Sequence, residues 1–85
     1  MDEDLAKAEQ GRLAITLAGI FQRARRRSGR SQRDLARDLG LPESRVSHVL
    51  NGNASNMTIE TAVRFATALG VTLRVTEHRV RKGRT

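Results

Sequence analysis

Hydrophobic residues recur at intervals of three and four along most of the chain, which is the spacing of amphipathic helices. The clearest stretch is 32–52, QRDLARDLGLPESRVSHVLNG, where two short helical patterns flank a turn. Each pattern places three apolar residues on one face: Leu35, Ala36 and Leu39 in the first, and Val46, Val49 and Leu50 in the second. Gly40 supplies the positive φ that ends the first helix, and Pro42 starts the second. The stretch therefore predicts two short helices joined tightly, with the small residue Ala36 at their crossing.

A longer helix is predicted upstream, from Leu13 to about Arg27, and Gly29 ends it. Its apolar stripe is Leu13, Leu17, Ile20, Phe21 and Ala24. Gly11 weakens the pattern before this helix, so residues 5–10 form either a helical extension or a frayed arm.

Capping residues mark the starts of two helices. Ser31 is a good N-cap, and Asp34 at the third helical position completes a variant of the capping box. Thr58 caps a fourth helix that Gly70 ends. The apolar stripe of that helix is Ile59, Ala62, Val63, Ala66 and Leu69. All four helices can therefore close on one core.

Residues 71–78, VTLRVTEH, alternate apolar and polar side chains and are rich in β-branched residues, which predicts a strand. Because a single strand has no partner in its own chain, we expect it to pair with the same strand of a second copy across a two-fold axis. The alternative is a floppy tail whose alternation is accidental. Residues 79–85 form a basic segment. We expect this segment to be disordered and to add non-specific attraction to DNA.

The two short helices form a helix-turn-helix, whose second helix enters the major groove of DNA. The residues and spacing from about Arg25 to Gly70 resemble the lambda-repressor-like helix-turn-helix family, also called the Cro or XRE family. The resemblance is carried by Gln32, Leu35, Ala36, Gly40, Val46, Val49 and the pair Asn51-Gly52. It implies an all-α, compact domain of four to five helices, to which this chain adds a short C-terminal β-strand where many relatives have a fifth helix.

The chain then divides into four parts: an arm or helical extension at 1–12, the helix-turn-helix domain at 13–70, the strand at 71–78 and the basic tail at 79–85. With 85 residues, it holds one hydrophobic core. It has no cysteine, no apolar run approaching the ~20 residues of a membrane span, and an acidic rather than basic N-terminus. We expect a soluble, cytoplasmic protein with no membrane partner.

The net charge of +7 is unevenly distributed. Residues 1–10 hold four acids against Lys7, whereas residues 23–45 hold eight arginines against three acids. The basic excess therefore lies on and around the helix-turn-helix, as expected for a surface that binds phosphates.

The predicted helix of about 43–51 is the one expected to read DNA sequence. Its outer face carries Glu43, Ser44, Ser47 and His48, at the positions that the family uses for base edges. Serine hydroxyls suit several bases, and histidine can donate to guanine. Glu43 can accept from cytosine, but an acid at a helix start equally complements the helix dipole.

A second group is expected to contact the DNA backbone: Arg25, Gln32, Arg33, Arg37, Arg45, Asn51 and Asn53. The resemblance implies a phosphate contact for Arg25 and Asn51, and for Gln32 a side chain that spans a phosphate and the recognition helix. Other roles remain open: Gln32 as a solvated first-turn residue, Arg33 and Arg37 as partners of Asp34 and Asp38, and Asn53 as a residue bonded to its own turn.

Catalytic or metal chemistry finds little support in the sequence. The only two histidines, His48 and His78, lie in different elements, whereas a zinc site needs three or four ligands. No nucleophile, base and orienting acid recur with a local signature. We expect no enzyme activity and no cofactor.

The sequence thus predicts a DNA-binding transcriptional regulator, acting as a homodimeric repressor on double-stranded DNA through the helix at 43–51. The alternative is the antitoxin of a toxin–antitoxin pair that represses its own promoter, with 1–12 or 71–85 as the surface for a toxin partner.

Overall fold

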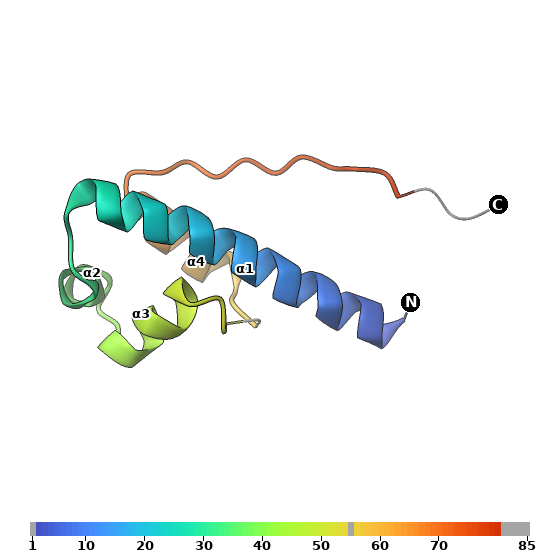
Figure 1. Ribbon diagram of the computed structural model, residues 1–85, viewed down its shortest axis with the longest axis horizontal. Coiled ribbons are helices and arrows are strands. Elements are labelled where there is room, and N and C mark those ends of the chain that lie inside the picture. Colours follow the sequence, from blue (N-terminus) through green and yellow to red (C-terminus); the bar gives the residue numbers. More distant parts are fainter. Residues whose placement is uncertain (1, 55, 81–85) are drawn as a thin grey trace.

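The computed structural model describes residues 2–54 and 56–80 of the chain. They form four helices, α1 (Glu3–Ser28), α2 (Gln32–Leu39), α3 (Glu43–Leu50) and α4 (Ile59–Ala68). In Figure 1, the long α1 crosses the molecule, α2 and α3 lie along one side of it, and α4 lies behind it in the view. The expected all-α class is confirmed.

The first helix starts earlier than its apolar stripe suggested. Asp2 is the N-cap, and its carboxylate accepts a hydrogen bond from the Asp4 amide at 2.9 Å. The helix continues unbroken through Gly11, so residues 3–12 are a helical extension. It ends at Gly29, with φ of 74°. Its buried face consists of Ala14, Ala18, Phe21 and Ala24. Leu13, expected on that face, is 53% exposed and lines an open depression with Met57 and Ile59 at the start of α4.

The capping signals in the sequence are confirmed. The Ser31 hydroxyl accepts from the Asp34 amide at 3.0 Å, and the Asp34 carboxylate accepts from the Ser31 amide at 3.3 Å. Gly40 ends α2 with φ of 68°. Thr58 accepts from the amide of Thr61 and starts α4. These caps are hydrogen bonds between residues a few positions apart, so the sequence alone can indicate them.

Only part of the predicted α4 stripe is buried. The buried residues are Ala62, Phe65, Ala66 and the C-cap Leu69, whereas Ile59 is 84% exposed and Val63 is 52% exposed. Val63 lies about 100° round the helix from Ala62 and so leaves the buried face. Ile59 is in the first turn, at the edge of that face. The expectation that these two residues are core residues was wrong.

The core draws on all four helices. At its centre the rings of Phe21 and Phe65 stack with centroids 5.5 Å apart. Leu35, Val46 and Val49 are also almost completely buried. Each such side chain stabilises the fold by about 1.5–3 kcal/mol relative to an exposed position. The helix-turn-helix therefore packs on a core that contains the aromatic stack between α1 and α4 and the aliphatic residues of α2 and α3.

Residues 71–80, termed the C-terminal segment below, form neither helix nor strand. The strand expected at 71–78 is therefore not formed in the single chain. Val71 donates to the carbonyl of Ala66 at 2.8 Å, and Val71 and Leu73 pack against the core. From Arg74 onward the segment is exposed, and in Figure 1 it lies on the side of α1 opposite to α3. A strand needs a neighbour for its backbone groups, and the described part of the chain offers none. Residues 81–85 of the predicted basic tail lie outside the described residues.

Candidate nucleic-acid interface

The unit formed by α2, the turn and α3 presents one helix to solvent on a rigid support. Gly40 and Leu41 make the turn, and the Leu41 amide donates to the Ala36 carbonyl at 3.0 Å. Ala36 itself is only 6% exposed, as expected where two helices pack closely. The buried faces of both helices belong to the same core cluster. The orientation of α3 is therefore determined by packing rather than by flexible loop contacts.

The outer face of α3 carries the residues that the sequence assigned to base reading. Glu43, Ser44 and His48 are exposed and Ser47 is half-buried, whereas Val46, Val49 and Leu50 are buried. The expected division of this helix into inner and outer faces is confirmed. The contacts of these four residues with bases stay a prediction.

Five of the predicted DNA-contacting residues line one shallow depression of about 290 Å³. They are Ser44, Ser47, His48, Asn51 and Asn53. The depression thus joins three candidate base-reading residues to two candidate backbone contacts, across the end of α3 and the loop that follows. Glu43, the first residue of α3, does not line it.

The loop after α3 is held closely against α1. Asn51 is the C-cap of α3, and its side-chain Nδ2 donates to the Ser47 hydroxyl oxygen at 3.2 Å. The next residue, Gly52, has φ of 79°, and a Cβ there would lie 3.3 Å from Ile15 Cγ1. The Asn53 amide then donates to the His48 carbonyl at 3.0 Å. These contacts place both asparagines beside the outer face of α3.

Comparison with known protein families decides what this arrangement is. Residues 16–79 match the family described as a helix-turn-helix domain. The chain belongs to the helix-turn-helix family. The match covers three quarters of the chain, from the middle of α1 through most of the C-terminal segment, and it agrees with the resemblance to lambda-repressor-like proteins. Neither the curated proteins nor the solved structures contain a match.

Membership of the helix-turn-helix family makes residues 16–79 a DNA-binding domain, and the reading of DNA by α3 stays a prediction. The first half of α1, residues 3–15, lies outside the matched region. The C-terminal segment lies inside it up to Arg79, so this segment is part of the helix-turn-helix domain rather than an appended tail.

Arg25, a candidate phosphate contact, has structural partners in the helix-turn-helix domain. Its Nε donates to Gln22 Oε1 and its Nη1 donates to the Arg30 carbonyl, both at 2.7 Å. The side chain is half-buried and holds the end of α1 to the start of the connection to α2. Two of its five N–H groups are used in this way, and the others remain available for a phosphate.

The remaining backbone candidates lie on α2 and α3. Gln32 is half-buried in the first turn of α2, and Arg33, Arg37 and Arg45 are exposed. Arg37 forms an ion pair with Asp34 at 3.2 Å. This pairing is one of the two roles that the sequence left open for Arg37. The hydrogen bond from the Ser31 amide, then that from the Ser31 hydroxyl, together with the charge and hydrogen bond of Arg37, hold the pKa of Asp34 below its usual range.

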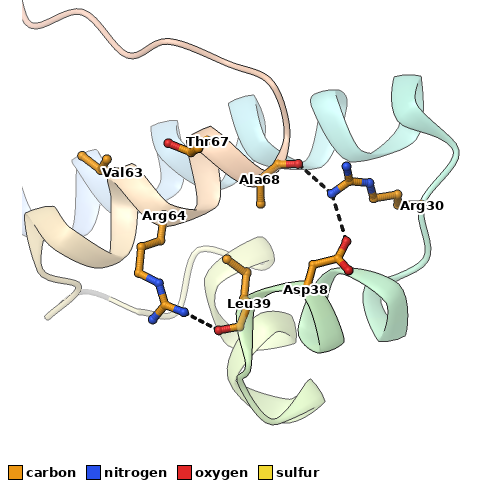
Figure 2. Close-up of a pocket in the computed structure, with 7 residues that line it drawn as sticks. All are labelled: Arg30, Asp38, Leu39, Val63, Arg64, Thr67 and Ala68. Atoms are coloured by element: carbon orange, nitrogen blue, oxygen red, sulfur yellow. Dashed lines mark hydrogen bonds and ion pairs between the residues drawn. The ribbon is translucent and has the colours of Figure 1, made fainter.

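Two arginines that sequence reasoning missed join α2 to α4 (Figure 2). Arg30 Nη1 donates to the Ala68 carbonyl at 2.6 Å and pairs with Asp38 at 3.2 Å. Arg64 donates to the carbonyl of Leu39. Both bind the last carbonyls of a helix, where a cation complements the helix dipole. They border an open cleft of about 560 Å³ between α2 and α4. No sequence signal identifies these pairs, because their members lie 38 and 25 residues apart.

Metal-binding clusters and membrane-spanning helices are both absent from the described ranges 2–54 and 56–80. No three His, Cys, Asp or Glu side chains gather there as a metal site would require. None of the helices in these ranges is long and apolar enough to cross a membrane.

Proposed function

We propose that the protein is a sequence-specific transcriptional regulator that represses by occupying its operator as a homodimer. The observation that carries the proposal is the depression at the end of α3, which gathers Ser44, Ser47 and His48 with Asn51 and Asn53 on a rigid helix-turn-helix. Hydroxyl, imidazole and amide groups form hydrogen bonds with base edges and with phosphates.

The exposed charge of the helix-turn-helix supports binding to DNA. Arg33 and Arg37 are exposed on α2, and Arg45 is exposed on α3. Each arginine that neutralises a phosphate releases counterions, which adds affinity without sequence preference. Under the proposal these arginines supply affinity and orientation, whereas the outer face of α3 supplies discrimination between sequences. Glu43, at the start of α3, complements the helix dipole and accepts from cytosine where the operator presents one.

The C-terminal segment supports the proposed homodimer. Its backbone is unpaired beyond Val71 within the described residues, and Val75 is 99% exposed. Pairing of residues 71–78 with their counterparts in a second copy would satisfy these groups and cover the valine. A symmetric dimer places two recognition helices roughly one turn of DNA apart, at successive major grooves. Occupancy of a promoter needs no further surface, which makes repression the simplest outcome.

Binding of the purified protein to labelled DNA from upstream of its own gene tests the proposal, with shuffled DNA as competitor at about 150 mM salt. We expect a preference of ~10³ or more and two chains per site. His48→Ala should relax base preference at roughly 1–3 kcal/mol per lost contact, whereas Arg33→Ala should weaken all DNA alike. Equal, weak binding to specific and shuffled DNA by the wild type would contradict a regulator of its own promoter.

A second function, that of an autoregulating antitoxin, is favoured by the first half of α1. Residues 3–15 lie outside the matched domain and expose Leu5, Leu13 and Ile15, by 62%, 53% and 66%. The turns of α1 before Ala14, the first buried residue of the helix, are marginal alone and gain stability from a partner. Co-purification of a small toxic protein with the tagged chain, and its loss in Leu5→Asp/Leu13→Asp, would favour this function. Recovery of the tagged chain without a partner protein would contradict the antitoxin function.

A further inference from the structure

Asn51 and Ser47 form the one side-chain hydrogen bond within the depression that the structure describes. Asn51 Nδ2 is the donor and Ser47 Oγ is the acceptor, 3.2 Å apart and one turn of helix from each other. Both residues line the depression with His48. The bond therefore lies on the surface that, under the proposed function, faces the bases.

We infer that Asn51 is a positioning residue that determines how Ser47 reads a base. This inference rests on the proposed function and names the residues that determine base specificity at one position of the DNA site. A side-chain NH₂ group only donates, so the bond engages Ser47 through its oxygen. The hydroxyl proton of Ser47 must then point elsewhere.

No protein acceptor takes that proton among the described residues. Other hydroxyls in α1 donate to carbonyls of their own helix: Thr16 to Arg12 at 3.0 Å and Ser28 to Arg25 at 2.8 Å. Ser47 makes no such bond in the described structure. Its proton is therefore directed to solvent in the free protein and to a base edge in the complex.

A serine that presents a donor discriminates between bases. In the major groove guanine offers N7 and O6 and thymine offers O4, all acceptors, whereas cytosine offers the N4 amino donor. Ser47 held by Asn51 thus favours guanine or thymine over cytosine at the base that it contacts. Asn51 keeps a second N–H on the same nitrogen, which remains available for the neighbouring phosphate. The residue thereby couples backbone contact to base reading.

The test replaces the hydrogen-bond donor at position 51 by a group that only accepts. Asn51→Asp replaces the amide by a carboxylate that only accepts, so the Ser47 proton turns toward Asp and the Ser47 oxygen is left to accept from a base. Asn53→Asp is the matched control, because it adds the same charge to the same depression and the side chain of Asn53 is not bonded to Ser47. Asn51→Ala and Ser47→Ala complete the set.

The measurement is selection of sites from random DNA by the full chain, followed by competition between single-base variants of the selected site. For each protein variant, the affinities for sites that differ at one base are compared with one another. A loss of affinity that the added charge causes at every site therefore cancels. Thermal unfolding confirms that each variant is folded. The wild type should favour guanine or thymine over cytosine about tenfold at one base pair per half-site. Ser47→Ala should abolish this preference, Asn51→Ala should reduce it to about threefold or less, and Asn51→Asp should shift it toward cytosine.

Asn53→Asp should weaken binding to all sites and leave the base profile as in the wild type. The inference is overturned if Ser47→Ala changes the profile but both Asn51 variants keep the wild-type profile, or if Asn53→Asp shifts it as Asn51→Asp does. A wild type that selects no sequence at all would instead overturn the proposed function on which the inference rests.

Discussion

The guanidinium of Arg30 caps the last turn of α4, with Nη1 2.6 Å from the carbonyl oxygen of Ala68. The same nitrogen lies 3.2 Å from the carboxylate of Asp38 near the end of α2. One side chain in the connection between α1 and α2 thus joins two helices that meet only in the folded chain (Figure 2). The position of α2, and with it that of α3, depends partly on this residue.

Arg30→Ala should therefore lower the free energy of unfolding by about 1 kcal/mol, the net value of a hydrogen bond. The pair with Asp38 adds little, because both side chains are more than a third exposed. Urea unfolding followed by circular dichroism measures the change. Arg26→Ala, at an exposed position in the last turn of α1, is the control and should change stability by less than about 0.5 kcal/mol. Equal losses in the two variants would contradict the capping role.

Gly52→Ala should destabilise the protein by about 1–2 kcal/mol because of its left-handed backbone alone. Its φ is 79°, and the new Cβ would also lie 3.3 Å from Ile15 Cγ1 and 3.4 Å from Ile15 Cα. Because Gly52 holds the loop that carries Asn51 and Asn53, DNA affinity should fall as well. Thermal unfolding and DNA titration measure the two effects. An unchanged melting temperature would mean that the loop after α3 is not held against α1.

Gly11→Ala should act in the opposite direction and stabilise the protein by about 0.5–1 kcal/mol. Gly11 lies inside α1, and a Cβ built there meets nothing within 4 Å. Alanine removes the entropic cost of ordering glycine in a helix without a steric cost. The measurement is thermal unfolding together with helical content. The absence of any gain in stability would indicate that residues 3–12 are not helical in solution.

The capping box should make stability depend on pH at the acidic end. The pKa of Asp34 is lowered in the folded state, chiefly by the Ser31 amide and hydroxyl, so the folded state favours the ionised carboxylate. Its contribution is therefore present above the unfolded pKa of about 3.9 and is lost as the pH falls through the lower folded value. Urea unfolding of the wild type and Asp34→Asn at a series of pH values measures it.

The wild type should be the more stable of the two at neutral pH, and the difference should shrink below pH about 4. Glu60→Gln, which removes an exposed acid from the first turn of α4, controls for loss of charge. A difference between wild type and Asp34→Asn that stays constant down to the most acidic pH would show that the carboxylate is not the stabilising form.

Arg25→Ala should weaken binding to all DNA sequences alike and reduce the slope of log affinity against log salt by about one unit. Because Arg25 also bonds to Gln22 and to the Arg30 carbonyl, the variant should lose stability too. Gln22→Ala removes one of these bonds while leaving the arginine in place, so it should keep the wild-type salt slope. A change in base preference on loss of Arg25 would argue that it reads sequence instead.

Sequence reasoning succeeded where the signal is local. The caps at Ser31 and Thr58 and the helix ends at Gly29 and Gly40 were predicted because each depends on residues a few positions apart. The inner and outer faces of α3 were predicted for the same reason, since helical periodicity separates Val46 and its apolar neighbours from the polar face. That division gave the outer-face residues, and the resemblance to lambda-repressor-like proteins implied their role in base reading.

Tertiary structure decided what local patterns leave open. Leu13, Ile59 and Val63 fit apolar stripes but are exposed, because the sequence does not say which part of a stripe the neighbouring helices cover. The alternation at 71–78 has strand periodicity, but strand hydrogen bonds require a neighbour that the described chain lacks. Within the site, the depression brings Asn53 beside Ser44, and that proximity depends on how Gly52 packs against α1.

The sequence by itself determined the helices, their caps and the polar face of α3, because each depends on hydrogen bonds or periodicity within about four residues. Only the folded chain decided the bonds of Arg30 to Ala68 and of Arg64 to Leu39, which join residues 38 and 25 positions apart. Such contacts depend on the angles at which helices pack. Those angles are set by the whole core at once rather than by any one segment.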